Sequence, residues 1–232
     1  MRRIARKIRA LSAKTSVNPK MKIMETREQR NIRSEVRMVE ESRRVEGYAL
    51  LFDTPSDGLD FTETIERSAL DGVLERSDVK AWLNHSPERG ILARYRGGSE
   101  GNSLELEVDD KGLRYAFDAP LTALGDELIE NLKRGDIDQS SFAFDVEKDK
   151  WTKNADGTWS RSILQFGRLY DVSPVYDAAY SATSVNMRGK ELAEEELERI
   201  AEEQRKAEEE ARKEAEKMPD SYYDDFSKQI NI

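Results

Sequence analysis

The chain has 232 residues, of which 37% are hydrophobic and 37% charged, and its formal net charge is −9 at pH 7. This length suits one domain of ordinary size, and the high polarity predicts that long segments lie outside its core. The acidic charge argues against a general nucleic-acid binder, although the basic N-terminus alone could contact a polyanion. The apolar runs are too short for a membrane span or a secretory signal, so we expect an intracellular protein.

Cysteine is absent, and His85 is the single histidine. These absences exclude disulfides, a thiol nucleophile, cysteine-bound zinc and zinc sites built on two or three histidines of one chain. A hydrolase of this composition needs a serine, threonine or carboxylate nucleophile, or a metal held by oxygen ligands. We assign neither a cofactor nor metal-binding residues.

Residues 1–33 form the first zone of the chain. Its first twenty residues carry seven lysines or arginines and no acidic residue. An apolar spacing through Ile4, Ile8 and Leu11 is compatible with a short basic amphipathic helix, but a flexible basic arm is the favoured interpretation. The native start is open among Met1, Met21 and Met24.

Residues 34–186 have the pattern of a folded domain. Alternating apolar and polar residues predict strands at 47–52, 104–108, 113–117, 142–146 and 164–175. Turn-forming residues at 109–112 and 154–157 predict hairpins between neighbouring strands. Helices are expected at 66–76 and at 124–134, where Gly135 is the stop signal. The fold class is therefore mainly β with a few helices (α+β), and we expect a closed or nearly closed barrel, which would leave no exposed strand edges.

Residues 187–232 form a charged tail. Glu, Lys, Arg and Ala dominate residues 190–217 and favour a helix. Its apolar stripe is thin, so a solvated helix is the first interpretation and a weak coiled coil or partner-binding helix is the second. The last segment, residues 219–232, would be a docking peptide or a frayed end.

Three residues are candidates for chemistry. His85 follows an apolar strand end in Trp82-Leu83-Asn84-His85-Ser86-Pro87, and an imidazole can exchange a proton near neutral pH. Taken alone, such a histidine is more often a surface residue. Ser141, with Ser140 beside it, begins the strand at 142–146, where a hydroxyl can be exposed beside backbone amides; a polar start of a strand is the structural alternative. Asp171 interrupts an apolar strand, and a carboxylate buried there needs a partner such as an imidazole, unless it faces water.

Together these segments resemble the caudovirus prohead serine protease family, the capsid-maturation proteases of tailed phages. The resemblance runs in order through residues 34–186 and has six parts. They are 47–52, 61–65 before a short helix, Trp82-Leu83-Asn84-His85, 109–113, 134–144 and 169–175 followed by Ala179-Tyr180.

The resemblance implies that Ser141 is the nucleophile and His85 its general base. Ser141 is favoured over Ser140 because the family's serine directly precedes a Phe-small-Phe strand. Two departures, Ala143 in place of glycine and Ala178 in place of proline, remove no reacting group. The family is similar in fold to the herpesvirus assembly proteases, which use serine and two histidines. With one histidine here, the third member is assigned to Asp171, with Glu63 and Asp138 in reserve.

The implied function is a serine endopeptidase that acts through an acyl-enzyme. Its implied partners are the major capsid protein with its scaffolding segment, other scaffold protein, and the protease itself through autocleavage or self-association, inside the immature capsid in the host cytoplasm. Neither a membrane nor nucleic acid is an expected partner. Two other interpretations stay open. One is an inactive scaffolding protein with a protease-like fold, and the other is a β-barrel module that recruits a partner through the acidic tail.

Overall fold

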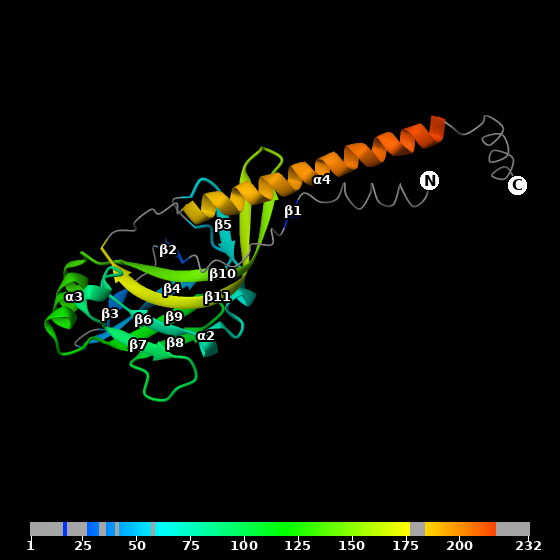
Figure 1. Ribbon diagram of the computed structural model, residues 1–232. Helices are drawn as coiled ribbons and strands as arrows, with labels where there is room; N and C mark the ends of the chain where they lie inside the picture. The colour runs from blue at the N-terminus through cyan, green and yellow to red at the C-terminus, as the bar shows by residue number, and fades with distance from the viewer. Residues whose placement is uncertain are drawn as a thin grey trace, which may run out of the picture.

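The computed structural model describes residues 16–17, 27–32, 36–39, 42–56, 59–176 and 184–216 (Figure 1). Its strands are β1 (Ser16–Val17), β2 (Glu28–Ile32), β3 (Arg37–Met38), β4 (Arg44–Leu51), β5 (Thr62–Ile65), β6 (Asp78–Ala81), β7 (Ala93–Arg96), β8 (Leu104–Val108), β9 (Gly112–Asp118), β10 (Gln139–Lys153) and β11 (Trp159–Val175). The helices are α2 (Val73–Arg76), α3 (Ala123–Arg134) and α4 (Ser184–Glu216), with single 3₁₀ turns η1 (Arg67–Leu70) and η2 (Pro87–Arg89). Several predicted features lie outside the described residues: the helix through Ile4, Ile8 and Leu11, Ala178, the Ala179-Tyr180 pair, and the segment 219–232.

The strands form two sheets. One has seven strands in the order β1-β10-β11-β6-β7, with β2 added beside β10 and β5 beside β11. The other has four strands in the order β3-β4-β9-β8. The expected mixture of many strands with few helices is confirmed, and the five predicted strand segments correspond to β4, β8, β9, β10 and β11, although the segment 47–52 runs one residue past the end of β4. Two strands, β1 and β2, lie in the part of the chain that was expected to be a basic arm.

The barrel prediction is wrong. Among the described residues, no strand of one sheet pairs through backbone hydrogen bonds with a strand of the other, so the sheets stack without closing. The edges are protected in other ways. The outer strand β3 is only two residues long, β7 carries Arg94 and Arg96, and β8 carries Glu105 and Glu107. Charged residues and short length on an edge strand discourage pairing with another chain, which removes the need for closure.

The helix predicted over 66–76 is interrupted. It consists of η1 and α2, separated by Gly72, whose φ of 65° lies in the left-handed region. Glycine adopts this conformation at no steric cost, and it ends a helix there. The α3 prediction is confirmed: the Thr122 side chain accepts a hydrogen bond from the Gly125 amide (3.3 Å), and the helix ends at left-handed Gly135.

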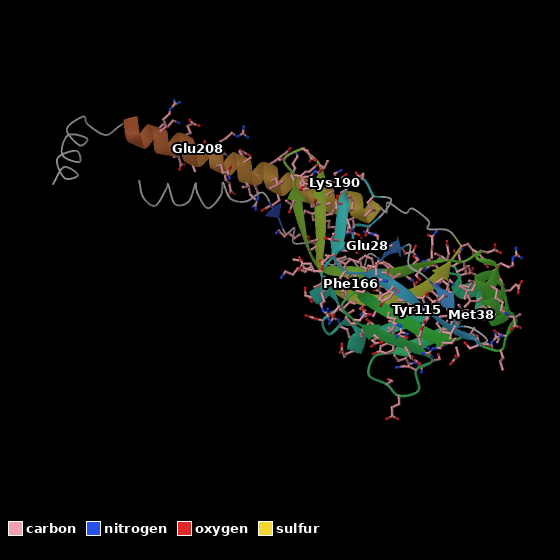
Figure 2. All side chains as sticks on the ribbon, turned by 180° about the vertical axis from the view of Figure 1, so that it is seen from behind. Glu28, Met38, Tyr115, Phe166, Lys190 and Glu208 are labelled. Carbon is pink, nitrogen blue, oxygen red and sulfur yellow. The ribbon has the colours of Figure 1, made fainter. Side chains whose placement is uncertain are left out.

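The main hydrophobic core lies between the two sheets. Phe142 and Phe144 of β10 and Phe166 of β11 stack there, with ring centroids of Phe144 and Phe166 4.5 Å apart. Tyr115 of the second sheet packs into the same core, and Figure 2 places it with Phe166 inside the two-sheet body. Because side chains alternate along a strand, this arrangement turns Ser141 and Ala143 toward the other face of β10.

The helix α4 packs against the turn end of the β10–β11 hairpin. Ala193 and Ile200 of the helix are buried against Phe61, Trp151 and Trp159 in a second, smaller apolar cluster. Lys190 lies near this contact, whereas Glu208 lies on the part of α4 that extends away from the body (Figure 2). No helix within the described part of the chain is both long and apolar enough to cross a membrane.

Candidate active site

The register between β10 and β11 brings two predicted site residues to one face of the sheet. Ser141 lies directly opposite Ser173, and Ala143 lies opposite Asp171. Residues opposite each other in an antiparallel pair point to the same face, and so do residues two apart in one strand. Ser141, Ser173 and Asp171 therefore share a face, and the side chains of all three are buried.

The loop after β6 brings the third predicted residue to Asp171. β6 runs parallel to β11, with Lys80 opposite Asp171. The Asn84 amide then donates to the Pro174 carbonyl of β11 at 2.9 Å, which holds the loop against that strand. Asn84 and His85 both adopt left-handed conformations, with φ values of 53° and 55°. This conformation costs about 1 kcal/mol or more in a residue other than glycine, and such strain is often found at functional sites.

His85 and Asp171 are in direct contact. Nδ1 of His85 lies 2.6 Å from Oδ1 of Asp171, although this oxygen lies off the direction of a ring N–H bond, so the two atoms are close without forming an aligned hydrogen bond. Oδ1 also accepts a hydrogen bond from the Ser173 hydroxyl at 2.9 Å. Within the described residues, Nε2 of His85 is buried without a hydrogen-bond partner. The imidazole is thus held on its Nδ1 side, and its other nitrogen remains open for a proton.

The Ser141 hydroxyl has a different partner. It donates a hydrogen bond of 3.0 Å to the backbone carbonyl of Arg30 in β2, the strand that pairs with β10 at this position. The expectation of an exposed hydroxyl is therefore not met, because Ser141 lies inside β10 and β2 covers it. The structure assembles His85 with Asp171 and places Ser141 on the Asp171 face, while the hydroxyl proton points at β2.

Arg27 is a neighbour of the candidate residue Asp171 that the sequence analysis missed. Its guanidinium donates to Oδ2 of Asp171, on the opposite side of the carboxylate from the Oδ1 contact with His85. The guanidinium also lies over the rings of Trp82 (5.5 Å) and Tyr170 (5.3 Å). Nothing in the local pattern signals this role, because Arg27 lies in a basic segment 144 residues before Asp171.

Ser140 faces the core. Its hydroxyl is hydrogen-bonded to the hydroxyl of Tyr115 at 2.9 Å, and both side chains are buried. Burial raises the pKa of Tyr115, and the hydrogen bond from Ser140 offsets part of that effect. Ser140 is therefore a structural residue that joins the two sheets.

Replacing Ser140 by alanine is expected to lower the free energy of unfolding by about 1–3 kcal/mol, because the Tyr115 hydroxyl would stay buried without this partner. Chemical denaturation measures this loss. Tyr115→Phe is the matched variant, and the double variant should cost less than the sum of the two single changes. A strictly additive double variant would show that the two hydroxyls do not interact.

The reserve residues occupy other places. Glu63 is buried, and its carboxylate is engaged by Arg30 (2.5 Å) and Arg161 (2.9 Å). Asp138 is exposed, just before β10. Arg168, another charged residue of β11, lies five residues before Ser173, about 16 Å from the position opposite Ser141. None of the three is placed to orient His85 or to stabilise charge at Ser141.

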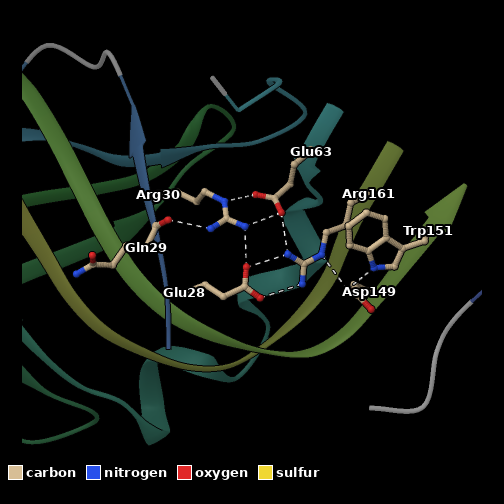
Figure 3. Close-up of polar contacts among 7 residues, drawn as sticks. All are labelled: Glu28, Gln29, Arg30, Glu63, Asp149, Trp151 and Arg161. Carbon is tan, nitrogen blue, oxygen red and sulfur yellow. Dashed lines mark hydrogen bonds and ion pairs between the residues drawn. The ribbon is translucent and has the colours of Figure 1, made fainter. Parts of the chain in front are cut away.

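A cluster of buried charges surrounds Arg30 and Arg161 (Figure 3). Arg161 forms ion pairs with Glu28 (2.8 Å), Glu63 (2.9 Å) and Asp149 (2.8 Å). Arg30 forms ion pairs with Glu63 (2.5 Å) and Glu28 (2.6 Å). Burial alone would raise the pKa of Glu28, but Arg161 and Arg30 hold it below its ordinary value. The cluster thus joins β2 to β5, β10 and β11 through ionised groups.

The family model described as caudovirus prohead serine protease matches residues 32–198. A solved structure, the capsid assembly protease gp21 of bacteriophage T4, is 12% identical, covers 66% of this chain and 98% of its own, and superposes with a TM-score of 0.39. No curated protein matches the chain. The family match spans well over half of the sequence and includes His85, Ser141 and Asp171, so the chain belongs to the caudovirus prohead serine protease family.

Proposed function

We propose that this protein is the serine endopeptidase that matures a phage procapsid, with Ser141 as nucleophile, His85 as general base and Asp171 as the residue that orients His85. The observation that carries the proposal is the 2.6 Å contact between His85 Nδ1 and Asp171 Oδ1, on the face of the sheet to which Ser141 also points. A carboxylate beside one imidazole nitrogen leaves the other free to take the serine proton, which is the arrangement that activates a hydroxyl for acyl transfer.

The reaction begins when the Ser141 hydroxyl turns from the Arg30 carbonyl to Nε2 of His85. Oγ then attacks the carbonyl carbon of the substrate peptide bond as the proton moves to Nε2, and the Asp171 carboxylate stabilises the imidazolium. The imidazolium gives its proton to the leaving amine, and an ester on Ser141 remains. Water, with His85 again as base, hydrolyses this ester and restores the hydroxyl.

Backbone amides of β10 are suited to stabilise the oxyanion. In an antiparallel strand, successive residues direct their N–H groups to opposite sides. One of the amides of Ser141 and Phe142 therefore faces β11, and the other faces the side that β2 occupies. A donor on the β2 side becomes available only when that strand is displaced. Each such donor typically contributes about 3 kcal/mol to the barrier reduction.

The substrates that fit this proposal are the scaffolding segment of the major capsid protein and the protease itself. Family membership supports an action on capsid proteins inside the immature capsid in the host cell, and the finer choice of substrate is inferred from that role. The chain would associate with these proteins during assembly, before cleavage begins. Self-cleavage would then remove charged segments outside the two-sheet body.

The proposal is tested by co-expression with the major capsid protein of the same phage. Mass spectrometry would determine the termini of both proteins for the wild type, Ser141→Ala and Ser140→Ala. We expect trimming in the wild type and in Ser140→Ala, and none in Ser141→Ala. Identical termini in all three would instead support an inactive scaffolding protein. Trimming that persists in Ser141→Ala and stops in Ser140→Ala would move the nucleophile to Ser140.

A scaffolding role is the second candidate, and one observation favours it. The described part of α4 continues well beyond its contact with the hairpin and carries ion pairs on its exposed surface, such as Lys206–Glu202. A long charged helix of this kind could contact other assembly proteins without any catalysis. This role is compatible with an active enzyme, so the co-expression result decides only whether cleavage accompanies it.

A further inference from the structure

The strand β2 lies where an extended substrate would pair with the strand that carries the nucleophile. It is antiparallel to β10, with Asn31 opposite Ser141 and Glu28 opposite Phe144. Peptides commonly bind proteins by adding a strand to an exposed edge, where main-chain hydrogen bonds supply affinity and alternate side chains supply specificity. Without β2, residues 140–144 of β10 would present such an edge directly beside Ser141.

Charged side chains hold both faces of the segment 27–32 against the rest of the protein. On one face, Glu28 and Arg30 reach the buried Glu63 and Arg161, and Arg30 also lies over the ring of Phe144 at 5.5 Å (Figure 3). On the face of the site, Arg27 reaches Asp171. The segment therefore places a cation, an acid and a second cation at positions 27, 28 and 30, each against a buried group of opposite charge.

The charged groups that remain when β2 is absent favour a strand whose own charges complement theirs. Arg161 is paired with both Glu63 and Asp149, and all three side chains are buried while β2 is docked. A strand with an acid and an arginine two residues apart adds one partner for Arg161 and one for Glu63. An apolar strand would bury the same carboxylates and guanidinium with fewer partners, and uncompensated buried charge is strongly destabilising.

The same segment also holds two catalytic groups in an idle state. The Arg30 carbonyl accepts the hydrogen bond that the Ser141 hydroxyl donates, and the Arg27 guanidinium binds the second carboxylate oxygen of Asp171. Departure of residues 27–32 would free both groups together and would uncover one edge of β10.

We infer that residues 27–32 are a built-in occupant of the substrate groove, which keeps Ser141 idle while docked, and that the groove takes extended segments with a glutamate and an arginine two residues apart. This inference rests on the proposed function. It assigns Glu63 and Arg161 the role of specificity determinants, since they contact the segment at alternate positions and do not touch the reacting atoms.

A disulfide lock tests the inference in the full chain. Gln29 and Ala143 are opposite each other, and facing residues of an antiparallel pair lie about 4.5–5.5 Å apart at Cα, within disulfide range. The chain has no cysteine of its own, so Gln29→Cys/Ala143→Cys contains the only two thiols. We expect a fluorophosphonate probe to label Ser141 at least about tenfold faster in the reduced form than in the oxidised form, as read by intact mass.

A variant designed to displace β2 provides a second test. Glu28→Lys places a third cation beside Arg161 and Arg30 and should expel the strand, whereas Glu107→Lys makes the same change at a 68% exposed position of the other sheet. We expect faster Ser141 labelling and faster hydrogen exchange at residues 140–144 in Glu28→Lys alone. Protected amides at residues 112–118 verify that the variant is folded. If Glu28→Lys does not fold, the comparison of the oxidised and reduced forms of Gln29→Cys/Ala143→Cys tests the inference by itself.

Peptides test the charge pattern. A six-residue peptide with the sequence of residues 27–32 should slow labelling of the Glu28→Lys chain, and the same peptide with alanine at the positions of Glu28 and Arg30 should not. Equal slowing by both peptides would overturn the assigned specificity. Equal labelling of Ser141 in the oxidised, reduced and released forms would overturn the covering role and leave the proposed function intact. Absence of Ser141 labelling from every form, despite released β2, would instead refute the nucleophile on which the inference rests.

Discussion

Replacing His85 by alanine is expected to reduce the rate of capsid-protein trimming by about 10⁴-fold or more, as much as Ser141→Ala does. Both variants remove the path by which the hydroxyl proton leaves, and residues that act as one unit give losses that do not add. The double variant His85→Ala/Ser141→Ala should therefore be no slower than either single variant. The time course of trimming in cells that co-express the capsid protein measures these rates.

Asp171→Asn is the informative companion of that variant. The amide keeps the shape of the side chain but removes the charge that faces His85 Nδ1 and the Arg27 guanidinium. A loss of about 10³–10⁴-fold is expected, because the imidazole would no longer be oriented and its charged form would no longer be stabilised. Ser173→Ala, which removes only the 2.9 Å hydrogen bond to Oδ1, is the control and should cost far less. Trimming at the wild-type rate in Asp171→Asn would show that Asp171 has a structural role alone.

Replacing Arg161 by methionine is expected to lower the free energy of unfolding by about 3–5 kcal/mol. The guanidinium is almost completely buried and bonds three carboxylates, those of Glu28, Glu63 and Asp149. Methionine fills much of the volume but leaves these acids buried with one fewer cation. In a chain of this size the loss corresponds to a fall in melting temperature of about 10 °C. Thermal unfolding followed by circular dichroism measures it.

The matched control is Arg67→Met. Arg67 forms an ion pair with Asp110, and the two side chains are 55% and 99% exposed. Pairs of this kind contribute about 0–1 kcal/mol, because water already solvates both charges. Equal shifts in melting temperature for Arg67→Met and Arg161→Met would contradict the assignment of the buried cluster as a stabilising element. A fall confined to Arg161→Met would support it.

Local patterns in the sequence predicted much of the fold. The alternation at residues 113–117 identifies β9, and Thr122 and Gly135 mark the ends of α3, since both signals depend on residues that are close in the chain. The break at Gly72 carries the same kind of signal, but the apolar face of 66–76 masked it. The barrel was mispredicted because alternation shows which residues are buried without showing whether distant strands meet at an edge.

The sequence by itself determined the family, the strand-rich fold class and the three residues that are proposed to carry the reaction, through motifs that each occupy a few neighbouring positions. Only the tertiary structure decided that His85 reaches Asp171, that Ser140 points into the core and Ser141 away from it, and that β2 pairs with β10 beside Ser141. The hydrogen bond from Ser141 to Arg30 spans 111 residues of chain, and the contact from Arg27 to Asp171 spans 144. Contacts over such separations arise from strand register and from the pairing of buried charges, and neither leaves a periodic signal in the local sequence.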